Sequence, residues 1–193
     1  MRVIPVLSAG FGEGHNAAAR AIVEALGRRP GLGGQLHDLF LEAYGPEKAR
    51  RQRDGYIGVA NKYPRLWGCM YTALDRLPLV RASLPFVRPV EKALGAMLDA
   101  SRPPVVVSAY PLYNYMMARR WRRDDPARPR LITVVTDSIS VNRAWHRAHS
   151  DWFVTPNRAT AEVMVRQGVP AAKVLPFGFP VAARLAPRSS AKP

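Results

Sequence analysis

A glycine-rich turn between an apolar run and an alanine-rich run constrains the fold of this 193-residue chain more than any other feature. The apolar run, Arg2–Ser8, predicts a buried strand, and Asn16–Arg28 predicts a helix with mostly small side chains on one face. The turn between them reads "AGFGEGH". A second predicted strand, Gln35–Phe40, ends near Asp38 and completes a β-α-β unit. Such a unit implies a parallel sheet, which binds ligands at the carboxyl ends of its strands.

The rest of the chain continues this alternation. Further strands are predicted at Pro104–Ala109, Arg130–Thr136, Asp151–Thr155 and Lys173–Pro176. Further helices are predicted at Glu47–Tyr63, Glu91–Ser101, Leu112–Arg123 and Ala159–Gln167. The pattern predicts an α/β fold with a doubly wound, Rossmann-like parallel sheet. We expect one domain over residues 1–181 and a linker or disordered tail over residues 182–193.

The charge of the chain predicts an anionic partner. Twenty-nine Lys and Arg stand against 14 Asp and Glu, which gives a formal net charge of +15. Nucleic acid, an anionic membrane surface and a phosphorylated substrate all fit that excess. No helix-turn-helix, zinc or RNA-recognition motif accompanies it, so nucleic acid is the less favoured partner. The histidines show no metal-ligand spacing, and no uncharged run reaches the roughly 20 residues of a membrane span. The single cysteine, Cys69, lies in an apolar stretch, where we expect it to pack.

The glycine turn predicts a site for a negatively charged group. Gly10, Gly12 and Gly14 allow backbone angles closed to other residues and let a ligand approach the main chain. The helix start adds unpaired N–H groups and a positive dipole end. The turn ends in Gly-His-Asn, so it is not a P-loop. A dinucleotide site lacks its third glycine, although Asp38 stands where the ribose-binding acid would be, so a nicotinamide or flavin enzyme remains an alternative.

His15 would lie in the first turn of the helix that follows. The positive helix end disfavours a second positive charge, so we expect its pKa to be lowered and its ring to be neutral at pH 7. A neutral imidazole beside a phosphate-binding turn is a candidate general base. A role in capping or packing the helix is the alternative.

A segment over residues 63–90 combines aromatic and aliphatic side chains with arginines. Trp and Tyr favour the headgroup region of a membrane, and arginines pair with anionic lipids. We therefore predict that this segment enters one leaflet, the alternative being a core helix with a solvated basic face. The residues predicted to contact the membrane are Trp67, Leu74, Arg76, Leu79, Arg81, Phe86 and Arg88.

Four blocks of the chain resemble, in order, the N-terminal domain of the diacylglycerol glycosyltransferases. They read "LSAGFGEGHNAAARAIVEAL", "NKYPRLWGCMY", "VVTDSISVNRAW" and "SDWFVTPNRATAEVMVRQGVPAAKVLPFGFPV". These enzymes are the monogalactosyldiacylglycerol synthases and the processive diacylglycerol glucosyltransferases. They are similar to the N-acetylglucosaminyltransferase that makes the peptidoglycan lipid precursor. The resemblance reaches about Val181 and implies the N-terminal half of a GT-B fold.

The resemblance also implies an activity. It is the inverting transfer of a hexose from a UDP-sugar to the 3-hydroxyl of diacylglycerol, at the cytoplasmic face of a membrane rich in anionic lipids. The UDP-sugar is the donor substrate, and no further cofactor is implied. Because the donor-binding half lies outside the match, we expect either a fragment or a stand-alone acceptor domain that works with a partner. A non-catalytic lipid-binding module is the alternative.

The resemblance assigns roles to particular residues. The glycine-loop histidine of the family matches His15, the predicted base, and Asp137 is predicted to orient His15 or the acceptor hydroxyl. In the family a histidine commonly follows this aspartate, whereas Asn142 stands nearby here. The predicted substrate contacts are Gly12, Glu13, Gly14, Asn16, Tyr63, Trp67, Tyr71 and Trp145.

Overall fold

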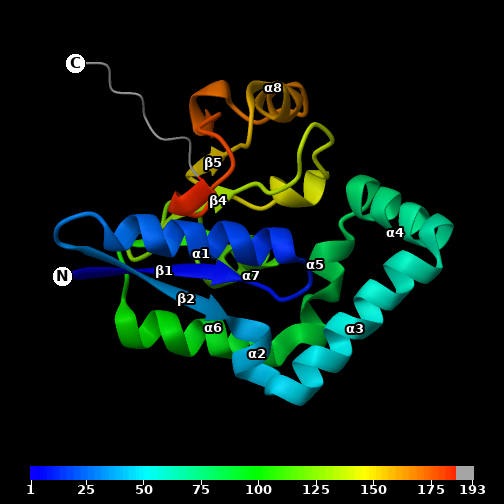
Figure 1. The fold of residues 1–193 in the computed structure, drawn as a ribbon, viewed down its shortest axis with the longest axis horizontal. Coiled ribbons are helices and arrows are strands. Elements are labelled where there is room, and N and C mark those ends of the chain that lie inside the picture. The colour runs from blue at the N-terminus through cyan, green and yellow to red at the C-terminus, as the bar shows by residue number, and fades with distance from the viewer. Residues whose placement is uncertain (186–193) are drawn as a thin grey trace.

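The structure, a computed structural model, describes residues 1–185 and holds one six-stranded, all-parallel sheet (Figure 1). Its strand order is β2-β1-β3-β4-β5-β6. The strands are β1 (Arg2–Ser8), β2 (Leu32–Asp38), β3 (Val105–Ser108), β4 (Arg130–Val134), β5 (Trp152–Val154) and β6 (Val174–Leu175). The predicted Rossmann-like α/β fold is confirmed. Of the predicted tail, Ala183–Leu185 forms one turn of 3₁₀-helix, and residues 186–193 lie outside the described residues.

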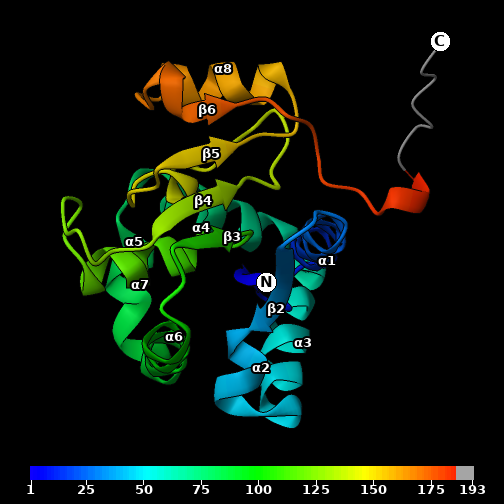
Figure 2. The same cartoon turned by 90° about the vertical axis from the view of Figure 1, so that its left-hand side faces the viewer.

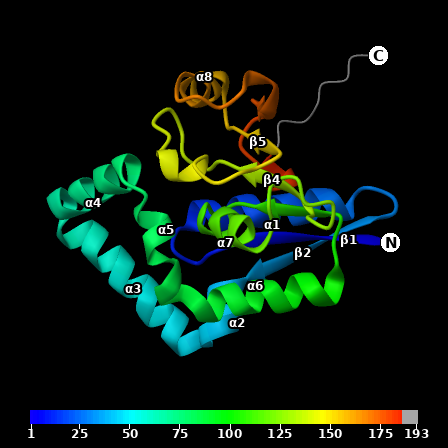
Figure 3. The same cartoon turned by 180° about the vertical axis from the view of Figure 1, so that it is seen from behind.

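Helices cover both faces of the sheet (Figures 2 and 3). On one face lies α1 (Glu13–Gly27), and on the other lie α6 (Arg88–Ser101) and α7 (Leu112–Arg120). The short α2 (Leu39–Tyr44) packs against α6, and α8 (Arg158–Arg166) packs against the β5–β6 edge. The two-sided cover explains why the strands read as apolar runs.

The first β-α-β unit forms as predicted, with one difference in the bounds of the second strand. The small inner face of α1 is buried, and the helix lies so close to β2 that a Cβ on Gly34 would sit 2.8 Å from the Cα of Val23. The second strand ends at Asp38, as predicted, but begins at Leu32 and not at Gln35. It ends there because the Asp38 carboxylate accepts hydrogen bonds from the N–H groups of Phe40 and Leu41, both at 3.1 Å, and so caps α2.

The predicted membrane segment is not one element. It contains α4 (Pro64–Arg76), α5 (Leu79–Ser83) and a 3₁₀-turn at Leu84–Val87, and it runs into α6. Together with α3 (Pro46–Lys62), α4 projects away from the sheet, and no residue of either helix is buried. Leu84 and Val90, by contrast, are fully buried in the core. The segment therefore contains both exposed helix and a part of the core. We refer to α3 and α4 together as the arm.

Two further observations bear on this segment. Cys69 is exposed on α4, so the prediction that it packs in the core is wrong. Over residues 1–185, none of the helices has the length and apolar character that a membrane crossing demands.

Candidate active site

The candidate site lies at the switch point of the sheet, where β2 and β3 are placed on opposite sides of β1. From β1 the chain passes through α1 to β2 on one side, whereas β3 joins β1 on the other side. At such a switch point the loops after the strands diverge and leave a crevice for ligands. The loops after β1, β3 and β4 supply the side chains of the site.

His15 occupies the third position of α1 and is held by groups from two other loops. Its Nδ1 lies 2.8 Å from the Oγ1 of Thr136, which follows β4. The half-buried ring also stands edge-on to Tyr110, with centroids 5.2 Å apart, and 5.8 Å from the ring of Trp145. Thr136 is the residue that sequence reasoning missed. The sequence favoured its neighbour Asp137, because a carboxylate after a strand is a more specific signal of a site than a hydroxyl.

The pKa of His15 is lowered from its ordinary value of 6.5, as predicted. Burial is the main cause, while the negative charge of Asp137 and the backbone of Ala109 act in the opposite direction. The imidazole is therefore neutral at pH 7. The sequence suggested the helix dipole as the cause, whereas the packing of aromatic rings around the imidazole supplies the burial.

The glycines of the turn are needed for space and not for conformation. Gly10, Gly12 and Gly14 all lie outside the left-handed region, so the expected backbone angles are absent. A Cβ on Gly12, however, would lie 3.2 Å from Cδ2 and 3.7 Å from Nε2 of His15. Gly12 thus leaves the second nitrogen of the imidazole uncovered. A Cβ on Gly10 would lie 3.2 Å from a carboxylate oxygen of Asp38.

The start of α1 presents backbone N–H groups. Its N-cap, Gly12, has no side chain, and no side chain caps the helix. Glu13 is exposed and forms an ion pair with Arg20. The Oδ1 of Asn16 accepts a hydrogen bond of 2.6 Å from the hydroxyl of Ser8, so this amide is tied to the end of β1. The first-turn N–H groups are consequently available to an anion.

Asp137 faces the arm and not the imidazole. Its Oδ2 accepts a hydrogen bond of 2.9 Å from the hydroxyl of Tyr71 on α4. Burial and the charge of Asp137 raise the pKa of both Tyr71 and Tyr56, so both phenols stay protonated. Asp137 therefore joins the arm to the site, and its influence on His15 is electrostatic.

The loop after β4 fastens the end of α4. The guanidinium of Arg147 donates hydrogen bonds to the carbonyls of all four residues from Leu74 to Leu77, at 2.5 to 3.5 Å. The Asn142 amide donates to the carbonyl of Tyr71 at 3.0 Å. These contacts satisfy the free carbonyls at the carboxyl end of the helix. No sequence signal pointed to Arg147.

Aromatic rings join the other side of the arm to the glycine turn. Tyr56 on α3 packs edge-on against Trp67 on α4, with centroids 4.7 Å apart, and against Phe11 in the turn at 5.4 Å. Phe11 in turn packs against Phe40 at 4.7 Å. The arm is therefore attached to the loops at both sides of the crevice.

Two predicted substrate contacts occupy different environments. Trp145 is 2% exposed and packs behind His15 in the core, so its burial does not favour a direct contact with substrate. Tyr63 lies at the junction of α3 and α4, where the amino group of Lys62 makes a cation–π contact with its ring. Asp38, considered as a ribose-binding acid, is occupied in capping α2.

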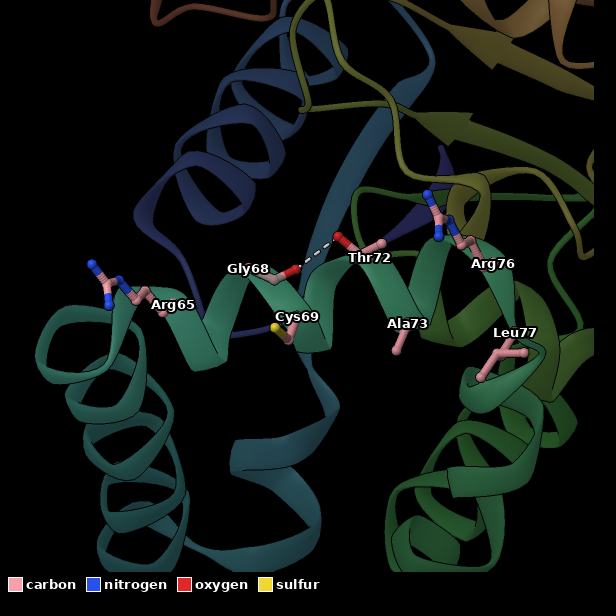
Figure 4. Close-up of a pocket in the computed structure, with 7 residues that line it drawn as sticks. All are labelled: Arg65, Gly68, Cys69, Thr72, Ala73, Arg76 and Leu77. Carbon is pink, nitrogen blue, oxygen red and sulfur yellow. Dashed lines mark hydrogen bonds between the residues drawn. The ribbon is translucent and has the colours of Figure 1, made fainter.

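One face of α4 is hollowed into an open groove of about 660 Å³ (Figure 4). Small side chains form its floor, and an arginine stands toward each end. The lining residues are Arg65, Gly68, Cys69, Thr72, Ala73, Arg76 and Leu77. Of the other side chains predicted to meet a membrane, Phe86 is 84% exposed, and Leu79, Arg81 and Arg88 are exposed as well.

Six parallel strands with helices on both faces define a Rossmann-like α/β domain, here with a histidine at the opening of its first helix. Residues 15–181 match the family described as monogalactosyldiacylglycerol (MGDG) synthase, and the chain belongs to that family. The chain is thus a member of a family of glycolipid-forming glycosyltransferases. A search of curated proteins found no match to the chain.

Proposed function

We propose that this domain supplies the acceptor site and the general base for transfer of a hexose from a UDP-sugar to the 3-hydroxyl of diacylglycerol, with inversion. The observation that carries the proposal, beyond the family, is a neutral His15 whose Nε2 is left open by Gly12 at the start of α1. The groups around His15 can serve proton transfer, stabilisation of the leaving group and access of the acceptor.

The imidazole is oriented for proton transfer. We assign the ring proton to Nδ1, which faces Thr136, so that Nε2 carries the free electron pair. As the acceptor oxygen attacks C1 of the sugar, its proton passes to Nε2. The bond from C1 to the diphosphate breaks on the opposite side, and its electron pair leaves with UDP. Attack opposite the leaving group inverts the configuration at C1.

The start of α1 can stabilise the leaving group. The backbone N–H groups of Gly12, Glu13 and Gly14 lie at the positive end of a 15-residue helix and have no side-chain cap. Such groups favour a diphosphate that gains negative charge during the reaction. Loss of one comparable donor in other enzymes costs about 3 kcal/mol of transition-state stabilisation.

The arm gives the acceptor a route from a membrane. Exposed apolar side chains on α4, among them Leu66 and Met70, accompany a groove bordered by Arg65 and Arg76. Basic groups around an apolar surface suit an anionic membrane better than a nucleic acid, which needs a continuous basic track. Each arginine near such a surface contributes about 1 kcal/mol. We therefore propose peripheral association with the cytoplasmic face of a membrane.

A transfer assay tests the reaction. The chain would be combined with a donor-binding half from the same family and given labelled UDP-galactose or UDP-glucose with vesicles that contain diacylglycerol. We expect a β-linked glycolipid and its near-complete loss in His15→Ala, with vesicle binding retained. Near-normal turnover in that variant would remove His15 from the role of base. Vesicle binding without any transfer by the unaltered chain would identify a lipid-binding module.

A vesicle assay tests the membrane part separately. Binding to vesicles with phosphatidylglycerol should weaken at high salt, and Arg76→Gln should weaken it further. The matched control is Arg122→Gln, which removes another exposed charge far from the arm in the sequence. Equal binding to neutral vesicles at every salt concentration would contradict the electrostatic part.

A further inference from the structure

A second polar pocket lies at the other edge of the sheet. It is formed where β5 and β6 begin, together with the loop that follows α7. Its volume is about 170 Å³, and its lining includes Arg123, His146, His149, Gln167 and Lys173. His15 lies at the carboxyl ends of the strands, so this pocket is separate from the candidate active site and independent of the proposed function.

The pocket concentrates positive charge. Arg123 forms no ion pair or hydrogen bond within residues 1–185, and the Lys173 amino group donates one bond of 3.2 Å to the carbonyl of Ser150. The carboxylate that faces them, Asp151, is already bound at 2.8 and 2.9 Å by both ends of the Arg128 guanidinium. Arg130 approaches the same carboxylate at 3.3 Å. One bound carboxylate therefore stands against four cationic side chains.

The charges act on one another as a group. Burial and the charge of Arg123 lower the pKa of Lys173, against the influence of Asp151. Burial, followed by the charges of Lys173 and Arg128, lowers the pKa of His149. An anion between these side chains would reverse these effects.

His149 supplies an independent observation. Its Nε2 is buried and has no hydrogen-bond partner within the described residues, and the nearest carboxylate oxygen of Asp151 is 3.6 Å away. A buried polar atom without a partner costs free energy, and such atoms in proteins usually have one. The imidazole also lines the pocket, so its ring signals report on an anion bound there.

We propose that this pocket binds a small anion carrying one phosphate group, held by Arg123, His149 and Lys173. A volume of about 170 Å³ is below the range of about 300–1,000 Å³ for drug-sized ligands, which favours a single phosphate over a nucleotide. None of the residues that line the pocket belongs to α4 or to its groove, which favours a soluble anion over a lipid headgroup.

Titration with inorganic phosphate tests the site. Binding would be followed by calorimetry and by the ring resonances of His149, at constant ionic strength set with chloride. We expect saturable binding, a shift of the His149 signals and a raised pKa of that ring. Arg123→Gln should weaken phosphate binding at least tenfold. Arg122→Gln removes the neighbouring exposed charge, which is 3.7 Å from Asp124 and outside the pocket, and should change binding less than twofold.

Three outcomes would overturn the proposal. They are the absence of saturable binding, equal losses in the two variants, and a loss of thermal stability in Arg123→Gln without a change in binding. The last would mean that the cations only offset the carboxyl ends of α7 and α8. Vesicles of phosphatidic acid would be added as a competitor of phosphate. If they reverse the shift of the His149 signals, the anion site stands but its ligand is a lipid headgroup. If they do not, the result supports a soluble anion.

Discussion

The hydroxyl of Thr136 lies 2.8 Å from Nδ1 of His15, although 121 positions separate the two residues in the chain. The bond is possible because β1 and β4 end at the same edge of the sheet with β3 between them. It leaves Nε2 as the free nitrogen, on the side that Gly12 keeps open. The orientation of the predicted base thus depends on a neutral hydroxyl, and the carboxylate of Asp137 is used elsewhere.

Thr136→Val should lower kcat about tenfold with little change in KM. The variant removes one hydrogen bond of roughly 1 kcal/mol and frees the ring to turn away from its present orientation. The measurement is the transfer assay with the donor-binding half. Thr136→Ser should restore most of the rate because it keeps the hydroxyl. A fully active valine variant would show that another group orients the ring.

The rate should depend on the protonation of His15. Because burial lowers the pKa of this ring below 6.5, kcat/KM should rise from acid pH and level off with a midpoint below 6.5. Between the lowered pKa and 6.5 the unfolded chain binds more protons, so the free energy of unfolding should also fall as the pH falls through this window. A pH–rate profile checks the first statement. His37→Gln, which alters a histidine 2.9 Å from Glu42, should keep the profile.

Gly12→Ala should impair the reaction while the domain stays folded. The φ of Gly12 is −164°, which is extended backbone open to any residue, so no strain is expected. The new methyl group would lie 3.2 Å from Cδ2 of His15 and crowd Nε2, and we expect kcat/KM to fall roughly tenfold. Gly27→Ala, at the far end of the same helix with open space around its Cβ, is the control and should keep full activity. An active Gly12→Ala enzyme would place the acceptor elsewhere.

Arg147→Gln should loosen the arm. The change removes the guanidinium that caps the end of α4, and hydrogen bonds to a charged group contribute about 1.5–3 kcal/mol each before screening at this exposed site reduces them. We expect faster tryptic cleavage after Arg76 and a lower rate of transfer. Arg143→Gln is the control, because that residue holds Asp75 through its backbone N–H at 2.7 Å. Equal cleavage in both variants would contradict the fastening role.

Asp151→Asn should destabilise the domain by about 3–5 kcal/mol, since it leaves Arg128 as an unpaired buried charge. Burial alone would raise the pKa of Asp151, but the bonds from Arg128 and from the N–H of Leu131 hold it well below its usual range. The unaltered chain should therefore lose this stability as the pH falls below about 4, where the unfolded carboxylate takes up its proton. Urea unfolding at several pH values measures it. Asp124→Asn, at an exposed ion pair, should change the free energy of unfolding by less than about 0.5 kcal/mol.

Local sequence determined the elements and the place of His15. Apolar runs and helical spacing fix which backbone segments form β1 and α1, because both periods act over a few neighbouring residues. The glycine turn and the histidine after it follow from that order. The end of β2 at Asp38 has the same local origin, since an aspartate before a helix caps it.

Tertiary structure alone decided how the site is built. Thr136 meets His15, Tyr71 meets Asp137 and Arg147 caps α4 across 66 to 121 positions of the chain. The spacing of residues along the chain does not predict such contacts, because they depend on which strands lie side by side and on how the arm packs against the loops that follow them. The same reason placed Cys69 at the surface and Trp145 in the core. The chain specifies its strands and helices by short-range chemistry, and packing then selects the neighbours of the imidazole.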